Sequence, residues 1–189
     1  MGLGEGEVEQ HTSLVEVDDL VVLILGAPGG LKANQGRIEG ITRLEKLVFL
    51  LEQESSLGGL LSENPDFKPY NFGPFSAKVY AAIDTLVLAG LAEDSTSAAS
   101  TPDDLWESEA VVGIEPSDAY ATRNVSLTQK GQRYYKALIR DLPEGTEKEL
   151  KGFKDRFAGV PLRQLVRYVY QKYPKMTERS VIRDDILGG

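Results

Sequence analysis

The amino-acid sequence predicts a mainly α-helical fold with one small β-hairpin. Apolar residues recur every three or four positions in several segments, and this spacing is clearest in "TRLEKLVFLLEQE" at residues 42–54. By contrast, "YATRNVSL" at residues 120–127 alternates in the manner of a β-strand. The chain has 189 residues, which is enough for one domain with a substantial hydrophobic core.

The first helix is expected within residues 13–27, where "SLVEVDDLVVLILGA" reaches a glycine stop at Gly26. The glycines and the lysine that follow resemble a phosphate-binding loop. However, the Walker pattern requires lysine directly after glycine and a hydroxyl residue next, whereas here a leucine precedes Lys32 and an alanine follows it. Pro28 also removes one backbone N–H donor. We therefore interpret residues 27–40 as a turn-rich loop.

Residues 42–54 form the clearest predicted helix. Thr42 and Glu45 match the T-x-x-E capping box, in which each side chain bonds to a free backbone N–H of the first turn. The apolar stripe of this helix consists of Leu44, Leu47, Val48 and Leu51. Phe49 and Leu50 widen the stripe, so we expect this helix to be central to the core.

A connection rich in glycine and proline, residues 56–75, separates this helix from the next and cannot form a regular helix. The next helix is predicted at residues 76–89, with Ser76 as N-cap and Gly90 as the C-terminal stop. Its apolar stripe consists of Val79, Ile83, Leu86 and Val87.

Two strands with an unusually long connection are expected next. The first begins at residues 91–93, and the second is residues 120–127. Between them, residues 94–119 contain no lysine or arginine and are rich in serine, threonine, alanine and acidic residues. We therefore expect a β-hairpin with an enlarged acidic loop.

Further helices are predicted in the C-terminal part. One begins at Thr128, and a second begins at a capping box formed by Thr146 and Glu149. A third has Pro161 at its first position and stops before Pro174. A last short helix is expected near the end of the chain.

Three helices followed by a two-stranded hairpin is the order of a winged-helix domain, a variant of the helix-turn-helix. Helix 76–89 would occupy the recognition position and the hairpin would be the wing. The sequence thus predicts a flexible N-terminal arm at residues 1–12 and a winged-helix-like core at residues 13–142, with the enlarged wing loop at 94–119. Residues 143–189 are expected to be a helical extension packed on the core.

Four segments within residues 37–93 and 120–182 carry a resemblance to known proteins: "GITRLEKLVFLLE", "FKPYNFGPFSAKVYAAIDTLVLAGLAE", "LTQKGQRYY" and "PLRQLVRYVYQKYP". They resemble the YwgA-like proteins and the wider Panacea (SocA-like) group. This resemblance implies a compact, mostly helical domain with a winged-helix-like core. In the Panacea group it implies binding of protein partners, either as antitoxins that neutralise toxins or as adaptors that deliver them to a protease.

The composition excludes several classes of site. The chain has no cysteine, so it has neither disulfides nor a thiolate metal site, and His11 is its only histidine. The acidic N-terminus does not resemble a signal peptide, and the longest apolar run, residues 20–25, is too short to span a membrane. We expect a cytoplasmic protein that is not an enzyme, with no catalytic, cofactor-binding or metal-binding residues and no membrane association.

The charge is distributed unevenly along the chain. Residues 1–122 carry 6 basic and 21 acidic side chains, whereas residues 123–189 carry 15 and 8. Helix 76–89 offers only Lys78 to a DNA backbone, and the adjoining loop is acidic, so DNA binding in the usual winged-helix mode is not expected. The alternative is a DNA-binding transcriptional regulator that uses basic C-terminal helices. Its candidate residues are Arg156, Arg163, Arg167, Lys172 and Lys175.

The favoured function is recognition of a protein partner, which requires aromatic or apolar anchors surrounded by polar groups. The candidate partner-binding residues are Phe72, Phe75, Tyr80 and Trp106. The last of these lies among carboxylates, in an acidic and aromatic segment typical of docking motifs. A homodimer is also left open by the sequence.

Overall fold

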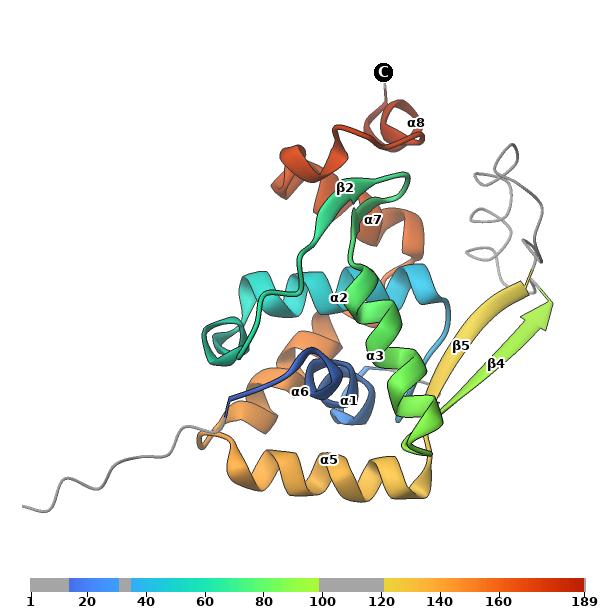
Figure 1. Ribbon diagram of the computed structural model, residues 1–189. Helices are drawn as coiled ribbons and strands as arrows, with labels where there is room; N and C mark the ends of the chain where they lie inside the picture. Colours follow the sequence, from blue (N-terminus) through green and yellow to red (C-terminus); the bar gives the residue numbers. More distant parts are fainter. Residues whose placement is uncertain (1–13, 31–34, 99–120, 189) are drawn as a thin grey trace, which may run out of the picture.

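The computed structural model describes residues 14–30, 35–98 and 121–188. Within these residues the protein is mainly helical, with a small antiparallel sheet and a separate two-stranded hairpin (Figure 1). The predicted N-terminal arm and most of the predicted acidic loop, Trp106 included, lie outside the described residues. None of the helices in the described part of the chain is long and apolar enough to cross a membrane.

Helix α1, Val17–Gly26, lies at the centre of the molecule (Figure 1) and confirms the predicted helix that ends at Gly26. All of residues 20–25 are completely buried, as expected for a helix that is hydrophobic on every side. The ammonium of Lys154, itself buried, donates hydrogen bonds to the carbonyls of Leu25 and Ala27 at 2.8 and 2.9 Å. It thereby caps the C-terminal end of α1, and burial lowers the pKa of Lys154 to about 8.

The three-stranded sheet contains β1 (Arg37–Ile38), β4 (Ala92–Ala98) and β5 (Ala121–Leu127), in the antiparallel order β1-β5-β4. The predicted strand pair is confirmed, but β4 continues to Ala98, so residues 94–98 belong to the strand and not to the acidic loop. The prediction that residues 27–40 are only a loop was wrong, because β1 lies within them. A strand of two residues carries no alternation, and it forms here because β5 supplies its hydrogen-bonding partner.

Helix α2, Ile41–Glu54, and helix α3, Ala77–Leu88, confirm the second and third predicted helices. The connection between them contains a 3₁₀ helix, η2 (Ser56–Leu60), and a hairpin of β2 (Lys68–Tyr70) and β3 (Gly73–Phe75). Ser76 is the N-cap of α3, as predicted, because its Oγ accepts a hydrogen bond from the Val79 N–H at 3.2 Å.

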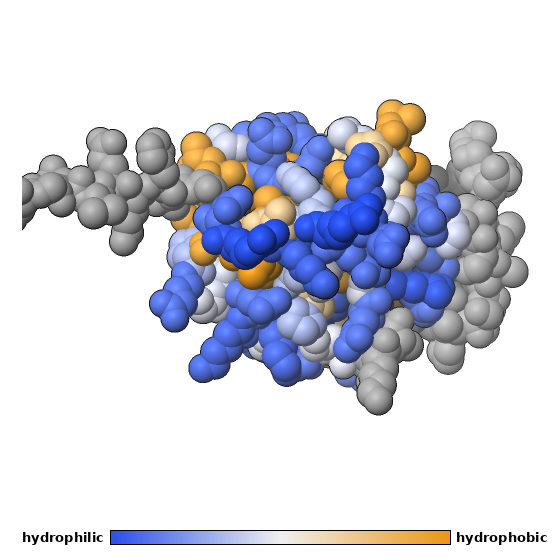
Figure 2. Space-filling view, turned by 90° about the horizontal axis from the view of Figure 1, so that it is seen from below, coloured by the Kyte–Doolittle hydropathy of each residue, from blue (hydrophilic) through white to orange (hydrophobic). Residues whose placement is uncertain are grey.

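The C-terminal helices are α5 (Gln129–Asp141), α6 (Thr146–Phe157), α7 (Leu162–Lys172) and α8 (Arg183–Leu187), with a 3₁₀ helix, η3 (Pro174–Thr177), before α8. Pro161 was predicted to be the first residue of α7, but it is the N-cap, and the helix begins at Leu162. Helix α5 runs along the bottom of the molecule in Figure 1, far from the β2–β3 hairpin at the top. Seen from below, this end of the molecule is mainly hydrophilic (Figure 2).

Both predicted capping boxes were wrong. The N-caps of α2 and α6 are Gly40 and Gly145, and neither helix has a side-chain cap. The two glutamates bond elsewhere instead. Glu45 accepts the Ser76 N–H at 2.8 Å, and Glu149 accepts the Ser56 N–H at 2.7 Å. Donors from distant parts of the chain thus replace the local backbone donors that the pattern predicts.

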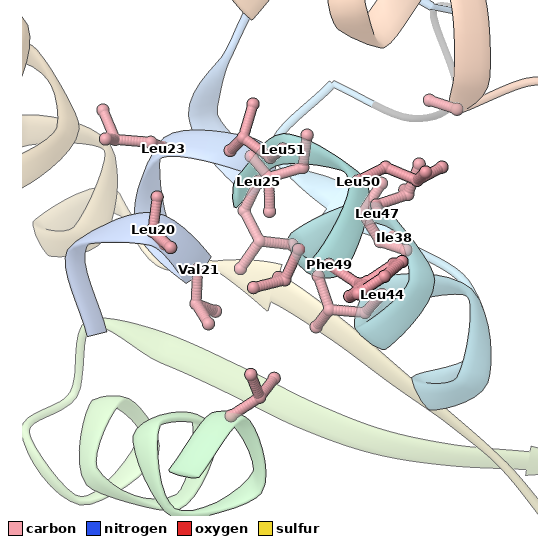
Figure 3. Packing of buried hydrophobic residues seen from close by; sticks show 14 of the residues in the cluster. Leu20, Val21, Leu23, Leu25, Ile38, Leu44, Leu47, Phe49, Leu50 and Leu51 are labelled. Carbon is pink, nitrogen blue, oxygen red and sulfur yellow. The ribbon is translucent and has the colours of Figure 1, made fainter. Parts of the chain in front are cut away.

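The hydrophobic core is one cluster that gathers side chains from α1, β1 and α2 (Figure 3) and includes apolar residues of α6, α7 and α8. Apart from Val87, the residues of the two predicted apolar stripes are all at most 2% exposed, namely Leu44, Leu47, Val48, Leu51, Val79, Ile83 and Leu86. Val87 was wrongly assigned to the buried stripe of α3. It is 36% exposed because it lies on the solvent side of that helix.

The start of α5 is clamped to the turn between α3 and β4. The helix predicted to begin at Thr128 is α5, which has Thr128 as its N-cap, and the Thr128 hydroxyl also lies 2.7 Å from the Gly90 carbonyl oxygen. Lys130 donates to the Ala89 carbonyl at 2.7 Å, at the C-terminal end of α3. The backbone of Gly131 packs directly against the carbonyl of Leu91. The "LTQKG" segment therefore joins α3, the sheet and α5.

Candidate functional site: an aromatic pocket at the β2–β3 hairpin

Two buried charged residues of α2 position the β2–β3 hairpin. The Lys46 ammonium donates a hydrogen bond to the Pro74 carbonyl at 2.7 Å, and the Glu45 carboxylate accepts one from the backbone N–H of Ser76 at 2.8 Å. Their side chains are only 1% and 4% exposed, and Nζ of Lys46 lies 3.8 Å from Oε2 of Glu45. The pair therefore fixes the backbone on both sides of Phe75.

Burial raises the pKa of the Glu45 carboxyl. The charge of Lys46 and the hydrogen bond from Ser76 act in the opposite direction, but burial has the larger effect. A buried pair of this kind costs desolvation energy, which its mutual attraction and its hydrogen bonds must offset. Both partners have backbone hydrogen bonds to the hairpin, so removal of either would leave a buried charge without compensation.

The far side of the hairpin is held by the C-terminal segment. The Asn71 carbonyl accepts hydrogen bonds from the Val181 N–H and the Ser180 hydroxyl, both at 3.1 Å. Gly73 has φ of 87°, and a Cβ on it would lie 2.7 Å from the ring of Tyr170. Only glycine fits this position without strain, because the backbone is left-handed and the ring is buried. The hairpin is therefore fixed between α2 and the C-terminal helices.

These constraints create an open pocket of about 220 Å³ between the hairpin, α2 and the first turn of α3. Its walls contain three adjacent aromatic rings, with centroids 5.1 Å apart for Tyr70 and Phe75 and 5.3 Å apart for Phe75 and Tyr80. The residues that line it are Thr42, Glu45, Lys46, Tyr70, Asn71, Phe72, Gly73, Phe75 and Tyr80. Four of these nine residues are aromatic, and Thr42, Glu45 and Lys46 add buried polar groups.

The structure brings three of the four candidate partner-binding residues to this one pocket. Phe72, Phe75 and Tyr80 all line it, and each is only partly buried. Trp106 lies outside the described residues. Sequence reasoning did not identify Glu45, Lys46 or Tyr70 as parts of a site. The sequence does contain one indication of them. Glu45 and Lys46 are adjacent opposite charges within the otherwise apolar "LEKLVFLL", and a buried helix tolerates such charges only when both groups have partners.

A second cluster joins the end of α2 to α7. The Glu54 carboxylate is 9% exposed and lies 2.9 Å from the Lys172 ammonium. It also accepts hydrogen bonds from the hydroxyls of Tyr168 and Tyr173, each at 3.0 Å. Arg156 lies 3.7 Å from Glu54 and its guanidinium stands over the ring of Phe157. Two of the candidate nucleic-acid-binding residues, Arg156 and Lys172, are therefore engaged within the protein.

Burial by itself raises the pKa of Glu54, but the hydrogen bonds from Lys172, Tyr168 and Tyr173 outweigh it, so the pKa lies below its ordinary value. A carboxyl whose pKa is lower in the folded protein stabilises the fold above its unfolded pKa and loses this contribution as pH falls through the folded pKa. We expect Glu54→Gln to lower the free energy of unfolding by about 1–3 kcal/mol at pH 7. The difference from wild type should shrink below pH 4.5, the ordinary value for this carboxyl.

Urea denaturation at pH 7 and at several lower pH values tests this expectation. Glu178→Gln is the matched control, because Glu178 is exposed and makes no ion pair with any residue in the described part of the chain. A destabilisation by Glu54→Gln that is the same at every pH would contradict the assigned role.

Several other basic residues considered for DNA binding are also paired. Lys78 of α3 lies 2.7 Å from Glu63 and 3.1 Å from Asp66. Near α8, Arg163 lies 3.0 Å from Asp185, and Arg167 donates to the Ile186 carbonyl at 2.8 Å. In contrast, Lys175 of η3 is exposed and forms no ion pair with a residue that the structure describes.

No family model matches the chain, and no curated protein or solved structure gave a match. The resemblance to the YwgA-like and Panacea groups therefore stays a prediction.

Proposed function

We propose that this protein is a cytoplasmic, non-enzymatic binding module that recognises a protein partner through the aromatic pocket at the β2–β3 hairpin. The observation that carries the proposal is the convergence of Phe72, Phe75 and Tyr80 on one open pocket with a rigid backbone. Interfaces are anchored by aromatic or bulky side chains that fill such pockets, and a rigid pocket loses little entropy on binding. An antitoxin-like or adaptor-like role is consistent with this mode of recognition.

We also infer that residues from α1 to β5 form a winged-helix core. The order α1-β1-α2-α3-β4-β5 and the sheet order β1-β5-β4 support this inference. In this interpretation, the β2–β3 hairpin is an insertion before the third helix. The binding pocket would thus be an addition to the core. It would lie near the start of α3, which occupies the position of the DNA-recognition helix in a winged-helix domain.

The alternative function, a DNA-binding regulator, has less support from the charges. Lys78, the basic residue of α3, is paired with two carboxylates. Arg123 of β5, in the wing, lies 2.6 Å from Asp84 and also pairs with Asp94. If these side chains bound DNA phosphates, they would first have to break their existing ion pairs. This cost reduces the free energy that they could contribute to binding a duplex.

Affinity capture from the native host tests the proposed function with a matched pair of variants. Tyr80→Ser removes a wall of the pocket, whereas Leu88→Ser changes a residue of the same helix that is 89% exposed and outside the pocket. We expect a co-purifying protein that is retained by wild type and by Leu88→Ser and is lost with Tyr80→Ser. Thermal unfolding must show that both variants remain folded.

Retention of the partner by Tyr80→Ser and by a second variant, Phe75→Ser, would refute the assignment of the pocket. Tight, salt-dependent binding of duplex DNA that is lost when Arg163, Arg167 and Lys172 are changed to glutamine would favour the alternative function instead.

A further inference from the structure

Three basic side chains lie on or beside the hairpin. Lys68 lies on β2 directly opposite Phe75 in the strand pairing. Lys175 lies on η3, which packs against both hairpin strands, and Arg179 precedes the segment that bonds to Asn71. All three are exposed, and none forms an ion pair with a residue in the described ranges. The segment 174–181, which contains Lys175 and Arg179, has one acidic residue, Glu178, and it is exposed.

Exposed apolar surface borders the same hairpin. Tyr70 is 46% exposed on the edge of the pocket. Val181 is 60% exposed and is joined through its backbone N–H to Asn71 in the hairpin turn. Isolated exposed apolar residues are ordinary, but Tyr70 lines the open aromatic pocket and Val181 is bonded to Asn71, another residue of its lining.

From these observations we propose the chemistry of the partner: the pocket takes a bulky apolar or aromatic side chain from an acidic peptide segment. The anchor would pack against the rings of Phe75 and Tyr80, and flanking carboxylates would pair with Lys68, Lys175 and Arg179. Glu45 and Lys46 compensate each other at the pocket, so the anchor itself should be uncharged. This inference rests on the proposed function and specifies the kind of partner.

Complementary charge around an apolar anchor increases the association rate and selects the partner, while the anchor supplies most of the affinity. The two parts of the site therefore predict different results when changed. Loss of the pocket wall should weaken binding by a similar, large factor at every salt concentration. Loss of the surrounding cations should weaken binding moderately and should remove its dependence on salt.

Selection of a random peptide library displayed on phage against the full-length protein tests this chemistry. We expect selected peptides to contain tryptophan, phenylalanine or leucine flanked by aspartate or glutamate. Their affinity, measured by fluorescence anisotropy with the synthetic peptides, should fall at least about tenfold for Tyr80→Ser. It should fall about three- to tenfold for the triple variant Lys68→Gln, Lys175→Gln and Arg179→Gln.

The matched control is the triple variant Arg133→Gln, Lys136→Gln and Arg140→Gln, which removes three exposed cations of α5 at the opposite end of the molecule (Figure 1). This control should leave the affinity unchanged. Selected peptides that are basic or without acidic residues, or that bind Tyr80→Ser as well as wild type, would overturn the inference.

A single-stranded oligonucleotide, dT20, distinguishes a second ligand class, because bases also stack on aromatic rings among basic residues. Binding of dT20 that is stronger than that of the selected peptides and is lost with Tyr80→Ser would overturn the peptide assignment. If a host protein is captured through the pocket but contacts it with a neutral or basic segment, this inference fails while the proposed function stands.

Discussion

Gly131→Ala is expected to lower the free energy of unfolding by more than about 3 kcal/mol, at or beyond the upper end of ordinary overpacking. A Cβ at this position would lie 2.0 Å from the Leu91 carbonyl oxygen. That oxygen belongs to the backbone of the α3–β4 turn and is held in place, because it accepts the Thr128 N–H at 3.0 Å. The methyl group can therefore be accommodated only if the start of α5 moves away from the turn.

Such a movement would disturb several contacts at once, because Thr128 and Lys130 bond to the Gly90 and Ala89 carbonyls of the same turn. Urea denaturation of the two proteins measures the effect. Gly152→Ala is the control, since Gly152 also lies within a helix but a Cβ on it would meet no atom within 4 Å. We expect this control to raise stability by about 0.5–1 kcal/mol. A change of less than 1 kcal/mol for Gly131→Ala would refute the clamp.

The second large effect is expected from Leu47→Ala, which should cost about 2–5 kcal/mol. Leu47 is 0% exposed and lies among the side chains of α1, α2 and β1 (Figure 3). Its removal loses the burial of the deleted atoms and leaves a cavity, because the surrounding helices are fixed by their own contacts.

The same substitution at Leu88, which is 89% exposed, provides the control and should change stability by no more than about 0.5 kcal/mol. Denaturant midpoints at constant m-value measure both variants. If Leu47→Ala cost no more than Leu88→Ala, the assignment of α2 to the core would be wrong.

The features that the sequence predicted correctly depend on neighbours along the chain. Ser76 caps its helix as predicted, and the helix predicted to begin at Thr128 has Thr128 as its N-cap. In both cases a hydroxyl and the N–H three residues later are close, as in any helix start. The buried stripe of α2 follows from the 3.6-residue repeat, which needs no knowledge of the partner helices.

The features that were missed depend on residues far apart in the sequence. Glu45 was expected to cap its own helix, but a backbone N–H 31 residues away is the donor that it meets. Strand β1 forms because β5 supplies its partners: the Leu127 N–H donates to the Gly36 carbonyl, and Asn124 accepts a hydrogen bond from the Gly40 N–H. A strand of two residues carries no sequence pattern of its own. The pocket also depends on contacts between distant residues. Its aromatic residues were predicted individually, whereas the hairpin that brings them together is positioned by the hydrogen bonds from Lys46 to the Pro74 carbonyl and from the Ser76 N–H to Glu45.

The proposed contact between the aromatic pocket and a protein partner is measured most directly by site-specific photocrosslinking in the native host. The photoreactive residue p-benzoylphenylalanine is placed at Tyr70, 46% exposed on the edge of the pocket, or at Tyr134, 37% exposed on α5. We predict a light-dependent protein adduct from position 70 that disappears when Tyr80→Ser is added, and no such adduct from position 134. Equal adducts from both positions, or an adduct from position 70 that persists with Tyr80→Ser, would contradict a partner contact at the aromatic pocket.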